Sequence, residues 1–401
     1  MTIAIRDLVA ALALAIAPCT FAQTTPPPAS DTTAKPADQA AAPAAPAATP
    51  PPSAWTKKGI DIYLYGDVYG DLNFNHPENS INQNYNFDNI ANQARFSFGK
   101  VAFEKASGVL GFRIDAGLGT TVDFMQTAAA QPGPEGFKYL EQAYGEFRPP
   151  NSHGLEIDFG KFVTSVGAEV IEAGNNFNYS RSLLFSIGAP YFHFGAKATL
   201  PVTKDLTVGV QLVNGWNSVG NENSFETVGL VGNYVFNKKV AWNNTFLTGP
   251  QSEFQTPGQL PAQRYVRAYI NLYDTNFVFT MNDKTSLYAE YLFGTNKLPG
   301  ASTQKWTGLA GAAKYQITPR FAAAGRLEWF DDINGYATGI VQSLAEVTVT
   351  GEMKIVHGFL SRLEYRHDSS AAPYFNRGTD LMVARGQSTV ALALIASFGP
   401  K

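Results

Sequence analysis

The feature of this sequence that most constrains its fold is an alternation of apolar and polar residues that begins at Ile60 and recurs to the C-terminus. In residues 60–74, every even position is apolar or glycine, and the odd positions carry Asp, Tyr and Asn. A period of two is typical of a β-strand with two different faces. The run is about 15 residues long, which is more than twice the length of an ordinary strand. This length favours a tilted strand that crosses a membrane.

The segment at residues 110–124 indicates that the polar face is wet. Its apolar positions alternate with Arg113, Asp115 and Asp123. Charges at this spacing would be costly in the dry core of a β-sandwich, because an unpaired ion loses its hydration there. A barrel with a water-filled interior removes that cost. The sequence therefore predicts an all-β chain that forms a transmembrane, antiparallel, up-and-down β-barrel.

We expect about 16 strands, with a β-bulge near Gly99. Short and long connections alternate, about seven short and eight long, as in barrels with short periplasmic turns and long external loops. This arrangement places both termini in the periplasm. The expected strands cover residues 60–74, 94–105, 110–124, 138–148, 154–161, 190–200, 206–215, 223–237, 239–248, 264–281, 286–294, 306–317, 321–331, 342–356, 358–368 and 387–399.

Four short runs of sequence carry a resemblance to a known family. They are residues 158–162 (DFGKF), 169–172 (EVIE), 178–182 (NYSRS) and 213–216 (VNGW). Together they resemble the signature of the OmpL-like outer-membrane β-barrel porins, and the resemblance extends from about Ile60 to the C-terminus. It implies a β-barrel fold, an outer-membrane location and a pore, and it supplies no catalytic residues.

The N-terminal part of the chain carries signals for export and for a linker. Arg6 precedes an apolar segment, and the small residues Thr20 and Ala22 stand where a signal peptidase would cut, so residues 1–22 are predicted to be a cleaved signal peptide. Residues 23–55 are rich in Pro and Ala and predict a disordered periplasmic linker. Residues 56–401 then form the barrel. The single cysteine, Cys19, lies in the signal peptide, so the processed chain is expected to form no disulfide.

Composition argues against other classes of function. A net charge of −3 and the lack of a basic stripe argue against a nucleic-acid partner. No glycine loop of the phosphate-binding type is present, and we expect no cofactor and no metal. His367, Asp368 and Ser369 combine catalytic residue types, but neighbours in a strand point to opposite faces and cannot form a triad. We therefore expect no enzymatic activity.

Charged residues on the predicted inner face would line a pore. Both signs are mixed, which predicts a weakly polarised channel rather than one dedicated to anions; alternatively, many of these charges pair and stiffen the wall. The predicted pore-lining residues are Arg113, Asp115, Asp158, Lys197, Arg267, Lys314, Arg326 and Glu328. The same face carries Asp67, Asp123, Glu156, Glu290, Glu346, Glu352, Arg362, Glu364 and Arg366. Tryptophans near strand ends predict interfacial girdles, with core packing as the alternative: Trp216, Trp242, Trp306 and Trp329.

The longest connection, about residues 162–189, mixes apolar residues that need a surface to pack on with charges that need water. Because a barrel of about 16 strands is too wide for side chains to fill, we expect this loop to fold into the lumen as a constriction. Its two glutamates would form an acidic side, with the arginine opposite or near the base. A loop that lies flat across the outer mouth is the alternative. The predicted constriction residues are Glu169, Glu172, Arg181, Asn175 and Asn178.

The sequence thus predicts a porin for passive diffusion of small hydrophilic solutes and ions. A substrate-selective channel and a non-conducting barrel that anchors or adheres are the alternatives. The expected partners are outer-membrane lipid, the permeating solutes and the barrel-assembly machinery. A homotrimer is one of the assemblies considered, and the sequence leaves the oligomeric state open. An apolar last strand that ends near Phe398 fits recognition by that machinery, although three residues follow this aromatic residue.

Overall fold

The computed structural model describes residues 54–106, 108–127, 133–220, 226–253, 266–298 and 300–400. The predicted signal peptide, Cys19 and nearly all of the predicted linker lie outside these residues. The backbone of Arg267 belongs to a strand, but its side chain also lies outside the described part.

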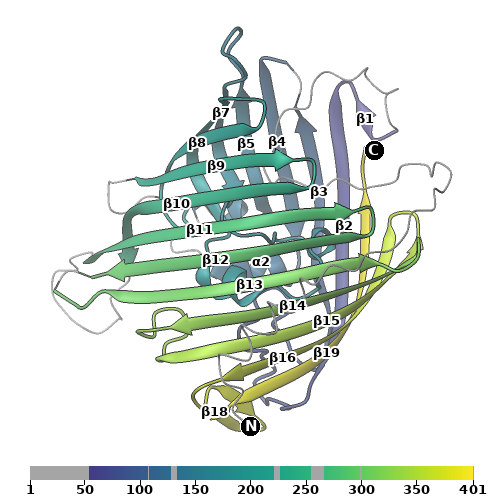
Figure 1. Ribbon diagram of the computed structural model, residues 1–401, viewed down its shortest axis with the longest axis vertical. Helices are drawn as coiled ribbons and strands as arrows, with labels where there is room; N and C mark the ends of the chain where they lie inside the picture. Colours follow the sequence, from purple (N-terminus) through teal and green to yellow (C-terminus); the bar gives the residue numbers. More distant parts are fainter. Residues whose placement is uncertain are drawn as a thin grey trace. The chain divides into compact units, whose positions relative to one another are not determined.

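Sixteen long strands form one closed antiparallel ring, as the sequence predicts (Figure 1). Each strand pairs with the next along the chain, and β19 pairs with β2 to close the ring. The strands are β2 (Ile60–Asn73), β3 (Ala94–Lys105), β4 (Leu110–Leu118), β5 (Leu140–Phe147), β6 (Glu156–Val163), β7 (Phe192–Pro201), β8 (Leu206–Val213), β9 (Thr227–Asn237), β10 (Val240–Glu253), β11 (Val266–Asn282), β12 (Thr285–Lys297), β13 (Gln304–Gln316), β14 (Phe321–Asp332), β15 (Gln342–Val356), β16 (Phe359–Ser370) and β19 (Gly386–Phe398).

Several short elements accompany the ring. The short strand β1 (Thr56–Lys57) pairs with the start of β2, and the last long connection contains the hairpin β17 (Phe375–Arg377) and β18 (Asp380–Ala384). The helical elements are α2 (Thr120–Thr127), the 3-10 helices η1 (Glu135–Tyr139) and η2 (Ala173–Asn175), and the single π-helical turn η3 (Leu184–Gly188). No helix among the described residues is long and apolar enough to cross a membrane.

The expected strand at residues 110–124 is too long. β4 ends at Leu118, and helix α2 follows. Gly119 interrupts the strand with φ +120°, and a Cβ at this position would lie 2.4 Å from the carbonyl oxygen of Ser97. Val122 is consequently buried inside, and Asp123 is exposed on a helix rather than placed on the inner face of a strand.

The bulge in β3 lies close to its predicted position. Asp67 and Val68 of β2 pair with Phe98 and Phe96, so Ser97 is the extra residue. It lies two positions before Gly99, where the sequence predicts the change of phase.

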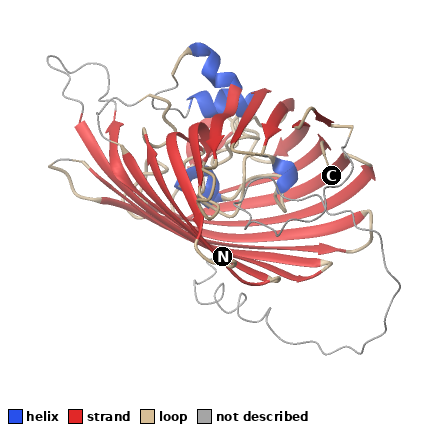
Figure 2. Cartoon of the chain, turned by 90° about the horizontal axis from the view of Figure 1, so that it is seen from above, coloured by secondary structure: helices blue, strands red, loops and turns tan. Residues whose placement is uncertain are grey.

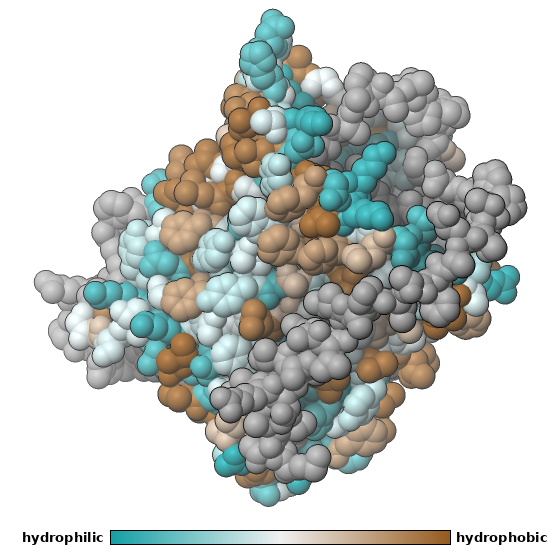
Figure 3. Space-filling model, viewed as in Figure 1, coloured by the Kyte–Doolittle hydropathy of each residue, from teal (hydrophilic) through white to brown (hydrophobic). Residues whose placement is uncertain are grey.

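The two faces of the wall have the polarity that the alternation predicts. Leu64, Val68 and Leu72 of β2 are about two-fifths exposed on the outside, whereas Asp67 is 1% exposed on the inside. Apolar side chains also gather over β7 to β9 (Figure 3), where Leu212 and Leu230 are exposed. This outer face is suited to lipid.

Ile114 tests the orientation of this wall. It lies at the centre of β4 and is 41% exposed on the outer face. Ile114→Arg is expected to impair assembly, because an arginine that faces lipid near the bilayer midplane costs roughly 2–4 kcal/mol, whereas Ile114→Leu should assemble normally. The fraction of protein that shows a heat-dependent shift in gel mobility measures assembly. Equal yields of folded protein from both variants would show that this face does not meet lipid.

The connections differ in length at the two ends of the barrel. Turns such as residues 238–239 and 283–284 form the short-turn end, and connections such as residues 74–93 and 164–191 form the long-loop end. The described chain enters and leaves the barrel at the short-turn end, where the rings of Trp55 and Phe398 stack with centroids 6.1 Å apart. The predicted alternation of short and long connections is therefore present.

The tryptophans divide into two groups. Trp242 faces outward and stacks on Phe277 with ring centroids 5.8 Å apart, and Trp329 pairs with the outward Leu309, so both fit a girdle. Trp306 is fully buried in the interior and Trp216 packs against it. The girdle prediction is wrong for these two residues. Trp216 belongs to a connection that folds inward, and Trp306 lies next to one at the start of β13. Figure 2 shows helices and loops inside the curved wall of strands.

Candidate functional site: the barrel interior

Residues 164–191, which we call the inserted loop, connect β6 to β7 and fold into the barrel. The amide of Thr164 donates to the carbonyl of Tyr191 over 2.9 Å and closes the base of the loop. Further along, the hydroxyl of Tyr179 donates to Asp67, in the middle of β2, over 3.0 Å. The loop also contacts β14, which lies half-way around the ring from β6. The inward course that the sequence predicts is therefore observed, and the flat arrangement across the mouth is not.

Carboxylates of the wall hold the backbone amides of the inserted loop. Glu364 accepts hydrogen bonds from the amides of Tyr179 (2.5 Å) and Ser180 (2.9 Å). Glu328 accepts one from the amide of Leu183 over 2.7 Å. Backbone amides of an irregular segment need partners when they are buried, and these carboxylates supply them.

A second pair of carboxylates holds the start of the inserted loop. Asp274 accepts the amide of Gly167 over 3.1 Å, and Glu290 accepts the amide of Ala168 over 3.0 Å. Asp274 is not among the site residues that the sequence predicts. The sequence feature that could have indicated Asp274 is its position in β11 two residues before Asn276, on the same inward face. Asn276 donates a hydrogen bond to Asp274.

Guanidinium groups of the wall hold the backbone carbonyls. Arg362 donates to the carbonyl oxygens of Ala173 (2.6 Å), Asn176 (2.7 Å) and Asn178 (2.8 Å). Arg362 itself is anchored by Glu352 at 2.9 Å. The planar guanidinium presents several donors in a fixed arrangement, so one arginine organises a whole turn of the loop.

Arg326 and Arg366 act in the same way further along the loop. Arg326 donates to the carbonyl of Ser180 over 2.7 Å and forms an ion pair with Glu169 over 2.8 Å. Arg366 donates to the carbonyl of Arg181 over 2.7 Å. Acidic wall residues thus match the backbone donors of the loop, and basic wall residues match its backbone acceptors.

The predicted constriction residues separate into buried and accessible ones. Glu169 is 3% exposed, and the side chain of Arg181 bonds to the loop carbonyls of Ile171 and Tyr179. Asn178 is fully buried and donates to Thr350. Only Glu172 and Asn175 retain exposure. Glu169 and Arg181 therefore support the loop from within, and a direct action on permeating ions stays a prediction for Glu172 and Asn175.

Glu172 belongs to a cluster of charges around Lys100. The ammonium group of Lys100 lies 3.1 Å from Asp115 and 2.7 Å from Glu141, and it also contacts Glu172. Burial raises the pKa of the Glu172 carboxyl, but the nearby ammonium group of Lys100 outweighs this effect and holds that pKa below its ordinary value. The carboxylates have the spacing of a metal site, but the lysine already supplies the cation that balances them.

The predicted pore-lining residues whose side chains are described all lie on the inner face and form ion pairs. The pairs are Arg113 with Asp115 (2.9 Å), Lys197 with Asp158 (3.0 Å), Lys314 with Glu352 (2.7 Å) and Arg326 with Glu328 (2.7 Å). The side chains of Lys197 and Lys314 remain about a quarter exposed, whereas that of Arg326 is not exposed at all. Pairing, which the sequence left open, is thus general among them.

Residues 74–93 form a second segment that enters the barrel, and the sequence did not predict this course. Asn86 donates to the carbonyl of Ser186 and to the hydroxyl of Tyr191. Phe87 is fully buried and contacts the rings of Phe185 and Tyr191. The available signal was a run of asparagines, which is also typical of a solvated loop.

Asp88 makes the docking of this second segment dependent on pH. Burial raises the pKa of the Asp88 carboxyl to about 7; Arg181 and Arg366 oppose the rise, and Glu364 and Asp71 add to it. In the unfolded chain an aspartate ionises near pH 3.9. The protonated Asp88 carboxyl therefore stabilises the folded protein relative to the ionised one. This stabilisation is fully present below about pH 4 and is lost as the pH rises through about 7.

We expect Asp88→Asn to remove this dependence. Relative to the wild type, its thermal unfolding midpoint should increase by a few degrees between about pH 5 and pH 8. Calorimetry of the two proteins at several pH values measures the difference. A constant difference would mean that Asp88 does not titrate in this range.

The catalytic residue types near the end of β16 do not come together. Asp368 is buried inside the barrel and pairs with Arg366 over 2.7 Å. His367 instead bonds to the hydroxyl of Ser388 on the neighbouring strand over 2.8 Å. The two side chains lie on different faces of the strand, as the alternation requires.

Comparison with known proteins supports the interpretation of the fold. Residues 59–398 match the family described as "Putative beta-barrel porin-2, OmpL-like". The chain belongs to this family. A search of the curated proteins found no significant match.

Solved structures of similar fold include proteins of three bacteria. The outer-membrane protein OmpT of Vibrio cholerae is 10% identical, with a TM-score of 0.57 over 86% of this chain and 99% of that one. The outer membrane channel DcaP of Acinetobacter baumannii is 11% identical, with a TM-score of 0.57 over 86% of this chain and 100% of that one. An anion-selective porin from Comamonas acidovorans is 8% identical, with a TM-score of 0.56 over 84% of this chain and 99% of that one. At these identities the likeness shows that this OmpL-like chain has the porin fold.

Proposed function

We propose that this porin forms a water-filled channel for passive diffusion of small hydrophilic solutes and ions across the bacterial outer membrane, with the inserted loop as its constriction. The observation that carries the proposal is the course of that loop from β6 to the opposite wall, at the height of Asp67 and Glu364. A ring of about 16 strands is too wide for its own side chains to fill, so the segments that enter it, of which the inserted loop reaches the opposite wall, determine how much of the lumen remains open.

The distribution of exposed charge supports a wet passage. The side chains of Arg148, Lys197 and Lys314 lie toward the short-turn end and are 27%, 26% and 23% exposed. Glu156, which pairs with Arg148, is 33% exposed. These accessible groups carry both signs, so we expect weak selectivity between small cations and anions.

Liposome swelling tests the proposal. Liposomes that contain the folded protein should swell rapidly in a pentose and much more slowly in a trisaccharide, and liposomes with boiled protein should not swell. A folded barrel that admits neither sugar would contradict the proposal and favour a non-conducting anchor.

The orientation and the assembly of the barrel are part of the same proposal. We place the long-loop end outside the cell and both termini in the periplasm, because short turns face the periplasm in such barrels. Protease added to intact cells should then spare the turn at residues 202–205, and cleavage there would invert the orientation. One of the similar structures is a trimer form of V. cholerae OmpT; we propose a homotrimer here, which chemical cross-linking in membranes would reveal as a three-chain band.

A further inference from the structure

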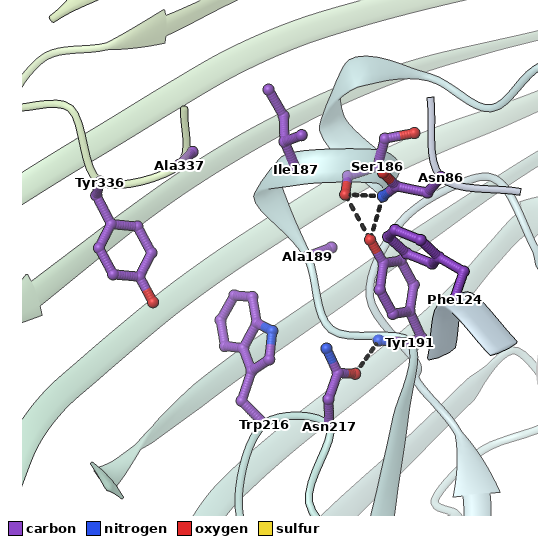
Figure 4. Close-up of a pocket in the computed structure, with 10 residues that line it drawn as sticks. All are labelled: Asn86, Phe124, Ser186, Ile187, Ala189, Tyr191, Trp216, Asn217, Tyr336 and Ala337. Atoms are coloured by element: carbon purple, nitrogen blue, oxygen red, sulfur yellow. Dashed lines mark hydrogen bonds between the residues drawn. The ribbon is translucent and has the colours of Figure 1, made fainter. Parts of the chain in front are cut away.

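A cavity of about 330 Å³ opens at the long-loop end, beside the inserted loop (Figure 4). Its volume lies at the lower end of the range for small-molecule sites, about 300–1,000 Å³. Four aromatic rings, three aliphatic side chains, two asparagines and one serine line it, and none of these side chains is charged. The barrel interior is otherwise rich in charges, so the cavity is a distinct environment.

Two of the rings form a fixed aromatic corner. Tyr336 stacks on the buried Trp306, with centroids 4.3 Å apart and planes inclined by 17°. Trp216 packs edge-to-face on the same ring at 6.3 Å and 71°. Trp306 is itself held by a hydrogen bond from its Nε1 to the carbonyl of Gly188 over 3.2 Å. Tyr336 and Trp216 remain partly exposed, so the corner offers two ring surfaces that are in place before any ligand arrives.

The two asparagines are oriented by the backbone and by a tyrosine. Oδ1 of Asn217 accepts from the amides of Tyr191 (2.6 Å) and Phe192 (3.3 Å), which leaves Nδ2 on the other side. Figure 4 shows this nitrogen close to Trp216. Nδ2 of Asn86 donates to Ser186 and Tyr191. Among the described residues, Nδ2 of Asn217 and Oδ1 of Asn86 have no hydrogen-bond partner, and neither has the buried Oγ of Ser186.

We propose that this cavity binds an uncharged pyranose sugar. A pyranose ring has an apolar C–H face that can lie on Trp216 or Tyr336, and its hydroxyls both donate and accept, which suits one free donor and one free acceptor. A charged solute would lose hydration without gaining a counter-charge. A purely aromatic solute would leave the amide groups unpaired, and a linear polyol loses more conformational freedom on binding.

The site belongs partly to the inserted loop, because Ser186, Ile187 and Ala189 line it. A sugar bound there lies at the entry of the proposed channel and would be concentrated before it passes. Binding does not depend on conduction, so the two proposals can fail separately.

Equilibrium binding to the full chain, folded in detergent, tests the site. The probes are D-glucose, the linear polyol sorbitol, the charged sugar D-glucuronate and benzyl alcohol, each titrated by calorimetry. Glucose should bind in the millimolar range, and the other three should bind at least about tenfold more weakly. Equal affinities for the four probes, or stronger binding of glucuronate or benzyl alcohol, would overturn the proposal.

Two substitutions locate the binding. Trp216→Leu removes one ring surface and Tyr336→Leu removes the other; the variant that loses the ring on which the sugar lies should bind glucose about tenfold more weakly. Trp242→Leu, on the outer face, is the matched control and should bind like the wild type. Retention of the heat-dependent gel shift shows that a variant has folded. Full affinity in both variants would overturn the proposal, as would equal affinities of the wild type for the four probes if a variant fails to fold.

Discussion

Replacement of Arg326 by methionine is expected to release the inserted loop while the barrel still closes. The side chain of Arg326 is completely buried and lies within 3.1 Å of Glu169, Glu328 and Glu346. It also donates to the carbonyl of Ser180. Without the cation, three carboxylates remain together in a buried site, and loss of one partner of a buried ion pair costs roughly 3–5 kcal/mol. The loop is the part that can move away, because the strands are fixed by their ladders.

The expected result is a larger single-channel conductance with more current noise. Lys314→Met is the matched control: it removes another inward cation, but its partner Glu352 keeps Arg362 and no contact with the loop is lost. Because Lys314 is also one of the accessible charges of the proposed passage, this control should change ion preference slightly, but it should not show the larger conductance and the current noise of a released loop. An Arg326→Met protein that folds and conducts like the wild type would show that Arg326 does not hold the loop in place.

Excision of residues 168–187, with a short Gly/Ser linker in their place, is expected to have the largest effect on permeation. The deletion removes the only chain that bonds to Glu364 and Arg362 across the lumen among the described residues, and both side chains would become hydrated. Conductance should rise at least about twofold, because a ring that is too wide for its own side chains to fill then contains residues 74–93 but no longer the inserted loop.

The excised protein should still form the closed ring, since neither β6 nor β7 is shortened. A heat-dependent shift in gel mobility provides the control for folding. If the excised barrel folds, inserts and conducts like the wild type, the inserted loop is not the constriction and another segment must narrow the passage.

The wall of the barrel could be predicted from the sequence because its environment changes at every second residue. Lipid on one side and a polar interior on the other leave a pattern that needs no knowledge of distant contacts. The pattern failed at residues 120–124, where Val122 and Phe124 fit both a strand that continues and a helix that packs inward. The strand and the helix are distinguished only by the backbone conformation of Gly119, and the alternation of apolar and polar residues carries no information about that conformation.

The inserted loop could be predicted as a unit, but the roles of its charges could not. Its mixture of apolar and charged residues indicated that it folds against a surface. The partner of Glu169, however, is Arg326, which is 157 residues away in the sequence. A double reversal of Glu169 and Glu172 to lysine, which the sequence suggests as a selectivity test, would therefore also break the buried contact with Arg326. For this reason Glu172→Gln alone is the better probe of ion preference.

The inward course of residues 74–93 was missed for a related reason. Asn82 bonds to Asn73 and Asp71, and Tyr85 bonds to Thr389 of the last strand. Asparagines that satisfy one another inside a barrel have the same composition as asparagines that face water. Only the three-dimensional partners distinguish the two cases.

Hydrogen exchange at the amides of Tyr179, Ser180 and Leu183 tests most directly whether charged wall residues hold the inserted loop across the lumen. These amides donate to the buried carboxylates of Glu364 and Glu328. We predict that they exchange as slowly as amides in the neighbouring strands β14 and β16, and much faster after Arg326→Met. Exchange in the wild type as fast as in an exposed connection would contradict the account, because the loop would then not be fixed to the wall.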